Sequence, residues 1–184
     1  MLMSIALLEI SFLGPAMRGE NQGARGTMAL FLSTYENKVD KKGRVSVPAS
    51  FRTAVATSHF TGVAIYRHIH LPCIEGSDIS FLERLTERLY EGYDPVSFDE
   101  LPTATSILAE SNQLAFDSEG RILLSAAMKE HAGIDGQATF VGLGRMFQIW
   151  APDRFAEHRL QQRGIVTDKA RSQSSNGTEA GGRS

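Results

Sequence analysis

Residues 40–52 read DKKGRVSVPASFR, and residues 117–129 read DSEGRILLSAAMK. The second stretch repeats the first at an offset of 77 residues, and both open on an Asp-x-x-Gly-Arg motif. A repeat at one fixed offset indicates that one structural unit is used twice. We therefore expect two related halves, each organised around one copy of the motif.

The motif predicts a tight turn between two strands. Asp40 and Asp117 suit the first position of such a turn, because an aspartate carboxylate accepts hydrogen bonds from backbone N–H groups two residues on. Gly43 and Gly120 can adopt the positive φ that a turn often needs. We interpret these four residues as structural residues of the turns.

A short helix should follow each turn. In the first copy, residues 45–47 alternate as a strand with both valines on one face. Pro48 ends that strand, and the next residues open a helix that carries Phe51 inward. In the second copy, Ser125 predicts a helix N-cap and Gly133 predicts the helix end.

Positive charge is concentrated at the first turn. One carboxylate, Asp40, is set there against five cations within fifteen residues: Lys38, Lys41, Lys42, Arg44 and Arg52. A solvated hairpin with an ordinary charged turn is one interpretation. The other is a loop that faces phosphate, with Arg44 long and planar enough to fork onto a phosphate or a guanine edge.

These motifs, with residues 35–52, 117–121 and 147–150, resemble the MraZ family of bacterial transcriptional regulators, encoded at the head of the division and cell-wall gene cluster. The resemblance covers about residues 28–164. It implies an α+β fold in which two pseudo-symmetric halves, like the AbrB and SpoVT DNA-binding domains, form a swapped-hairpin β-barrel with short helices.

The same resemblance implies a DNA-binding function. It predicts a ring-shaped homo-oligomer in the cytoplasm, at the nucleoid, that binds direct repeats in double-stranded operator DNA and represses its own operon. The sequence has no Gly-x-Ser-x-Gly, Gly-Lys-Ser/Thr or His-Glu-x-x-His motif, and we expect no enzymatic activity, no cofactor and no membrane partner. In the family the Asp-x-x-Gly-Arg loops face the DNA, which carries over here to Lys41, Lys42, Arg44 and Arg121.

The second turn departs from the first, because it has Ser118 and Glu119 where the first has two lysines. A carboxylate near phosphate repels it, so we expect the first turn to supply most of the DNA contact and Arg121 to be secondary. The family also usually keeps a proline where this chain has Ser125.

The repeat divides the chain into four segments. Residues 28–100 should form the first half with its helix, and residues 101–166 the second half. Residues 1–27 read as an N-terminal extension or as a misassigned start, with translation beginning near residue 28. Residues 167–184 are small and polar, which predicts a disordered tail.

Four further segments carry clear patterns. Residues 79–90 have an apolar stripe at helical spacing, and residues 103–113 predict a weaker helix. Residues 62–74 alternate as a strand or hairpin arm. Residues 138–150 predict a hairpin closed around Gly-Leu-Gly-Arg, and a last helix should begin at Pro152.

Composition and motifs weigh against several other functions. The net charge of −2 does not by itself indicate a nucleic-acid binder, so DNA affinity must come from local cations. His68, His70 and Cys73 suggest a metal site, but no fourth ligand lies nearby and we interpret them as structural. The alternatives to a DNA-binding regulator are a structural or scaffolding oligomer and a hydrolase that uses Asp40 and Asp117.

The segment from residue 75 to residue 100 is acidic, with eight carboxylates against two arginines. We expect it to face away from DNA or to meet a basic surface on a neighbouring subunit.

Overall fold

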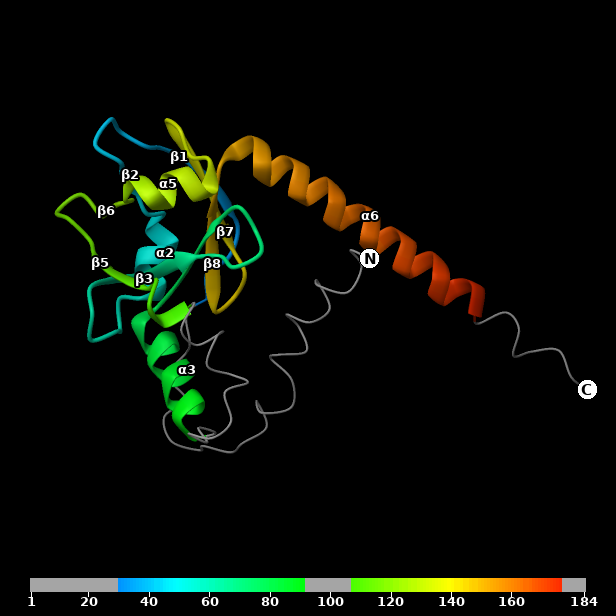
Figure 1. Ribbon diagram of the computed structural model, residues 1–184, viewed down its shortest axis with the longest axis horizontal. Coiled ribbons are helices and arrows are strands. Elements are labelled where there is room, and N and C mark those ends of the chain that lie inside the picture. Colours follow the sequence, from blue (N-terminus) through cyan, green and yellow to red (C-terminus); the bar gives the residue numbers. More distant parts are fainter. Residues whose placement is uncertain (1–29, 92–106, 177–184) are drawn as a thin grey trace, which may run out of the picture.

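The computed structural model describes residues 30–91 and 107–176, which form a mixed α+β fold (Figure 1). The first half contains β1 (Thr34–Lys38), β2 (Arg44–Ser46), α2 (Ala49–Ala54), β3 (Gly62–Arg67), β4 (Ile74–Ser77) and α3 (Ile79–Glu91). The second half contains β5 (Asn112–Ala115), β6 (Arg121–Leu123), α5 (Ala126–Ala132), β7 (Gln137–Gly142), β8 (Met146–Trp150) and α6 (Pro152–Asn176).

All strand pairs are antiparallel. Several of them join a strand of one half to a strand of the other. The larger sheet has the order β1-β7-β8-β4-β3-β5, and β2 pairs with β6 in a separate ladder. The first strand of each half pairs with the third strand of the other, β1 with β7 and β5 with β3. If each strand is replaced by the equivalent strand of the other half, the strand order of the sheet is unchanged when read from the opposite edge. Each half therefore needs strands of the other to complete its sheet.

The two copies of the motif make matching hydrogen bonds across the pseudo-symmetry. The backbone N–H of Val47 donates to the carbonyl of Gly120 at 3.0 Å, and that of Leu124 donates to the carbonyl of Gly43 at 3.0 Å. These are the same bond made twice, because both residue pairs are related by the offset of 77. The repeat in the sequence is thus a repeat in structure.

The expectation of a β-barrel needs correction for the described residues. The six-stranded sheet ends at β1 and β5, and the β2–β6 ladder is not joined to it as a continuous barrel wall. The β2–β6 ladder is separate from the sheet because the tight turns lead the chain out of the sheet after β1 and after β5. A single bridge, between Val39 and Val45, spans the first turn.

An aromatic cluster fills the space between the sheet and the two short helices. Phe51 of α2 is fully buried at its centre. Its ring centroid lies 5.2 Å from that of Phe31, 5.4 Å from that of Phe147 and 5.6 Å from that of Tyr35. Val45 and Ile122 point into the same core from the β2–β6 ladder. This core fixes the ladder, and with it both turns, to the body of the protein.

Two longer helices lie on the outside. The apolar stripe of α3 packs against Ala64 of β3 through Ile79 and Leu82, which confirms the helix predicted at residues 79–90. α6 begins beside β8, where the Trp150 ring stacks on His158 at 4.8 Å, and then extends away from the body (Figure 1). In the described part of the chain, no helix has the length and apolarity needed to cross a membrane.

Two predicted segments differ from the structure. α6 continues through Asn176, so residues 167–176 are helical where we expected a disordered tail. A helix whose start is already anchored can extend through such a segment, because adding a residue to a helix is easier than nucleating a new one. Residues 177–184 and residues 1–27, the proposed extension, lie outside the described residues.

The predicted helix at residues 103–113 is wrong at its end, because β5 begins at Asn112. Arg67 binds Glu110 with two contacts, at 2.8 Å and 2.6 Å, and so holds this segment beside β3. Pairing with β3 then overrides the weak helix propensity. Residues 103–106 lie outside the described residues.

Candidate nucleic-acid interface

Asp40 builds the first turn with its carboxylate. Oδ1 accepts the backbone N–H groups of Lys42 at 2.8 Å and of Arg44 at 2.9 Å. The backbone closes the same turn, because Gly43 N–H donates to the Asp40 carbonyl and Asp40 N–H to the Arg44 carbonyl, both at 2.9 Å. Gly43 has a φ of +87°, as the glycine in the motif predicts.

The other carboxylate oxygen of Asp40 holds the Arg44 side chain. Oδ2 accepts Nε of Arg44 at 2.7 Å and lies 2.6 Å from Nη2. The backbone hydrogen bond from Arg44, together with this ion pair and the Lys42 N–H, lowers the pKa of Asp40 to about 2. The Arg44 side chain is 38% exposed, and among the described residues no partner is found for its Nη1. One edge of this guanidinium is therefore available to a ligand.

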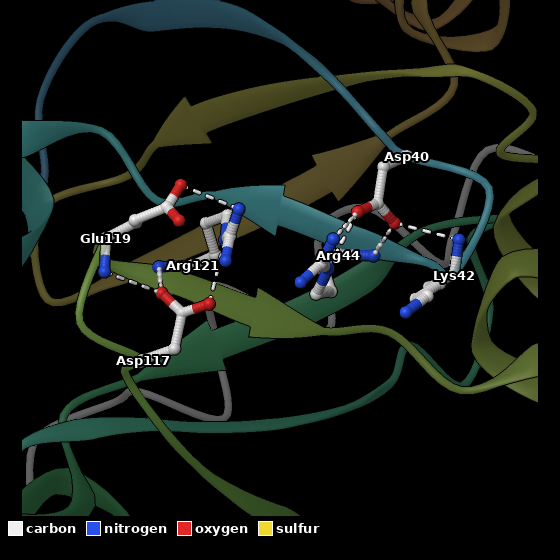
Figure 2. A network of polar contacts seen from close by, with 6 residues as sticks. All are labelled: Asp40, Lys42, Arg44, Asp117, Glu119 and Arg121. Carbon is white, nitrogen blue, oxygen red and sulfur yellow. Dashed lines mark hydrogen bonds and ion pairs between the residues drawn. The ribbon is translucent and has the colours of Figure 1, made fainter.

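The second turn repeats the hydrogen bonds from the aspartate to two backbone N–H groups and to Nε of the arginine (Figure 2). Oδ1 of Asp117 accepts the backbone N–H groups of Glu119 and Arg121, both at 2.9 Å, and Oδ2 accepts Nε of Arg121 at 2.7 Å. The pKa of Asp117 is lowered, chiefly by the backbone hydrogen bond from Arg121. The pKa of Arg121 is raised, chiefly by its side-chain hydrogen bond to Asp117.

The terminal guanidinium nitrogens have different partners in the two turns. Nη2 of Arg44 lies 2.6 Å from Oδ2 of Asp40, whereas only Nε of Arg121 is found to bind Asp117 among the described residues. Oε2 of Glu119 lies 2.7 Å from Nη1 of Arg121, so this guanidinium has carboxylates on two sides. The Arg121 side chain is 21% exposed, compared with 38% for Arg44. The residue that corresponds to Glu119 in the first turn is Lys42, a cation that cannot form this pair.

The two arginines lie on one face of the β2–β6 ladder. Arg44 pairs with Leu123, and Ser46 pairs with Arg121, so the two arginines are diagonal neighbours across adjacent strands. Leu123 is 55% exposed on the same outer face, while Val45 faces the core. Figure 2 shows both side chains folding back onto the aspartate of their own turn. The fold therefore brings together the two loops that lie 77 residues apart in sequence.

Each turn is also covered by a cation from the other half. The Arg52 side chain lies over Gly120, where a Cβ would come within 2.7 Å of Nε, and its Nη1 donates to the Val47 carbonyl at 2.6 Å. Lys129 has the equivalent place, with its Cε 3.6 Å from a Cβ built on Gly43. Arg52 was expected in the cationic cluster but not over the second turn, and no role was predicted for Lys129. The offset of 77 relates these two residues and could have paired them.

The surroundings of the two turns differ in charge. Lys41 and Lys42 are exposed beside the first turn. A cleft of about 470 Å³ opens beside the second turn, where Asp117 and Glu119 line it together with Arg52 and an apolar wall from Phe116. An anion that approaches the second turn therefore meets two carboxylates, while one that approaches the first meets two lysines.

Comparison with known proteins assigns the family. A family model described as "MraZ protein, putative antitoxin-like" matches residues 30–70 and 107–174. The chain is 44% identical over 142 residues to a protein of Rickettsia canadensis (strain McKiel), covering 77% of this chain and 95% of that protein. The chain belongs to the MraZ family.

Other MraZ relatives agree. A protein of Rickettsia akari (strain Hartford) is 45% identical over 131 residues, which cover 71% of this chain and 87% of the relative. A protein of Rickettsia bellii (strain OSU 85-389) is 41% identical over 143 residues, which cover 77% of this chain and 95% of the relative. All three relatives carry the name "Transcriptional regulator MraZ". Both Asp-x-x-Gly-Arg turns of this MraZ chain lie within the residues that the family model matches.

His68, His70 and Cys73 lie in or beside the loop between β3 and β4 of this MraZ chain. Nδ1 of His68 accepts the backbone N–H groups of His70 at 3.1 Å and of Leu71 at 3.2 Å, which shapes the loop between β3 and β4. Cys73 is fully buried against Trp150. Within residues 30–91 and 107–176 no group of three His, Cys, Asp or Glu side chains is arranged to hold a metal ion.

The acidic segment begins inside the protein. Glu75 is buried on β4, where Oε1 accepts the hydroxyl of Tyr66 and Oε2 lies 3.5 Å from Nε2 of His68. Glu75 therefore belongs to an internal polar network and does not form part of an outward acidic surface. Residues 92–100 of this segment lie outside the described residues.

Proposed function

We propose that this chain is a sequence-specific DNA-binding transcriptional regulator. Its MraZ relatives carry the name of a transcriptional regulator. The observation that carries the proposal is the placement of Arg44 and Arg121 on one outer face of the β2–β6 ladder, each held by the aspartate of its own turn. Pre-ordered guanidinium groups lose less side-chain entropy on binding a phosphate or a base edge.

The first turn carries most of the interaction in this proposal. Lys41 and Lys42 contact phosphates and so position the loop, which gives affinity without sequence discrimination. Arg44 reads a base edge, because a planar guanidinium matches the two acceptors of guanine in the major groove. Arg121 has a secondary role, since Glu119 and Asp117 already bind it.

The assembly and the target are further parts of the proposal. One subunit offers few phosphate contacts, and a ring of subunits that engages successive direct repeats raises affinity by roughly 10²–10⁴-fold when the geometry matches. In this proposal the repeats lie upstream of the chain's own division and cell-wall operon, and repression takes place in the cytoplasm at the nucleoid. The exchange of first strands between the halves supports a swapped-hairpin relation between them.

The two alternatives explain less of the structure. A scaffolding oligomer gives no role to the paired turn arginines. A hydrolase would need Asp40 and Asp117 as an acid pair, but each carboxylate is occupied by two backbone N–H groups and an arginine of its own turn. Lowered pKa values also keep both groups ionised, which does not suit a general acid.

A salt titration tests the proposal. Fluorescence anisotropy of the full chain with a duplex from its own upstream region should give a log affinity that falls linearly with log salt, by about 0.9 for each neutralised phosphate. A scrambled duplex of the same length should bind more weakly. Equal, salt-independent binding to both duplexes, or no binding to either, would contradict a sequence-specific DNA-binding function.

A further inference from the structure

The pair between Glu119 and Arg121 has no counterpart in the first turn, although the hydrogen bonds from the aspartate to the backbone and to Nε of the arginine are duplicated. Lys42 holds the corresponding position there, and its ammonium group cannot pair with the Arg44 guanidinium. Lys42 and Glu119 are thus equivalent positions of the two turns that carry opposite charges, and each lies two residues before the arginine of its turn.

We propose that Glu119 closes the second turn to DNA, so that each subunit reads duplex DNA through its first turn alone. This inference rests on the proposed DNA-binding function and identifies a specificity-determining residue of the same face. Glu119 takes the place of a phosphate, because its Oε2 accepts at 2.7 Å from Nη1 of Arg121. Arg44 binds one carboxylate, that of Asp40, whereas Arg121 binds two.

The neighbouring charges reinforce this closure. Asp117 binds Nε of Arg121 at 2.7 Å, so the guanidinium is held between two carboxylates. The Arg121 side chain is 21% exposed and that of Glu119 is 65% exposed, so the carboxylate closes the pair from the solvent side. Arg52, the other cation at this turn, donates to the Val47 carbonyl and lies over Gly120. No lysine like Lys41 or Lys42 is present in the second turn to attract phosphate.

Closure of one turn makes the DNA-binding face of each subunit asymmetric. With both turns open, the pseudo-twofold unit would present two equivalent loops, which suit a site with twofold symmetry. With one turn closed, each subunit contacts an asymmetric site. Copies arranged in one sense around a ring then fit sites that repeat in one sense along the DNA.

Substitution of Glu119 tests this inference directly. Glu119→Gln keeps the shape of the side chain and removes its charge, and Glu119→Lys copies the residue of the first turn. Glu157→Gln is the matched control, because Glu157 is an exposed glutamate on α6. Each full-length variant is titrated with the upstream duplex and with the scrambled duplex across a series of salt concentrations.

Glu119→Gln should tighten binding about three- to tenfold and steepen the log–log salt slope by about one, since one more guanidinium reaches a phosphate. Glu119→Lys should steepen the slope by about two. Glu157→Gln should match the wild type. If the wild type binds DNA and both Glu119 variants behave like Glu157→Gln, the inference is overturned while the DNA-binding function stands. If neither the wild type nor any variant binds, the proposed function itself fails.

Discussion

The carboxylate of Asp40 holds Arg44 at both its backbone and its side chain: Oδ1 accepts the backbone N–H at 2.9 Å, and Oδ2 accepts Nε at 2.7 Å. One residue therefore shapes the turn and aims the cation that the turn displays. Asp117 repeats this role for Arg121. In each turn the aspartate side chain therefore both stabilises the turn and orders the arginine side chain for binding a ligand.

The lowered pKa of Asp40 predicts an acid-sensitive contribution to stability. The pKa is about 2 in the folded chain, below the ordinary value of 3.8, so the unfolded chain binds the proton more readily. The contribution is fully present above about pH 4 and is lost as the pH falls toward 2. Thermal melts over this range should show a smaller acid-induced drop in Tm for Asp40→Asn than for the wild type.

Asp135→Asn is the control for that series, because Asp135 is an exposed aspartate and no hydrogen bond from its side chain to either turn is found among the described residues. It should follow the wild-type curve. Parallel curves for Asp40→Asn and the wild type would show that the carboxylate does not stabilise the fold.

The turn glycines should differ in their tolerance of alanine. Gly43 and Gly120 both have positive φ, which costs an alanine about 1 kcal/mol. A Cβ at Gly43 would also lie 2.8 Å from the backbone carbonyl of Leu124, whereas at Gly120 it would meet the movable Arg52 side chain. Chemical denaturation should therefore rank Gly43→Ala as the more destabilising variant.

Gly144→Ala separates backbone strain from steric conflict in this comparison. Gly144 has a φ of +84°, and no atom lies within 4 Å of a Cβ built there. Its loss of stability should be the smallest of the three. A loss as large as that of Gly43→Ala would mean that the contact with Leu124 has no effect.

Phe51 should be the most sensitive core position. Its ring is fully buried and lies beside four other aromatic rings at centroid distances of 5.2 Å to 6.2 Å. Phe51→Ala should lower the free energy of unfolding by about 3–5 kcal/mol. Leu160→Ala, at a side chain that is 68% exposed, should change it by less than about 0.5 kcal/mol. Similar losses at both positions would contradict this placement of the core.

The two cations of the first turn should have separable effects on DNA binding. Arg44→Ala should reduce discrimination between the upstream and scrambled duplexes by roughly tenfold to a hundredfold. Lys42→Ala should weaken binding to both duplexes alike and reduce the salt slope by about one. Size-exclusion chromatography should show the same oligomer for both variants. An Arg44→Ala variant that keeps full discrimination would exclude base reading by this residue.

Local features of this fold follow from local sequence. The Asp-x-x-Gly-Arg turns, the N-cap at Ser125 and the left-handed glycine that ends α5 were all predicted, and the structure confirms them. Each depends on side chains that act on backbone groups a few residues away. The hairpin of β7 and β8 was predicted for the same reason.

Features that depend on distant partners could not be predicted in this way. The end of the expected helix at residues 103–113 gives way to β5, because β3 and Arg67 hold that segment. Arg52 lies over Gly120 only because the halves exchange strands. Glu119 was expected to repel phosphate, but its pairing with Arg121 depends on side-chain geometry that spacing alone does not fix.

The exchange of first strands also governs how the chain can be made. β1 spans Thr34–Lys38, yet its hydrogen-bonding partner is β7, Gln137–Gly142. During translation the ribosome must release nearly all of the second half before β1 can pair. Until then the nascent protein presents an open strand edge to its surroundings, so chaperone demand should peak late in synthesis.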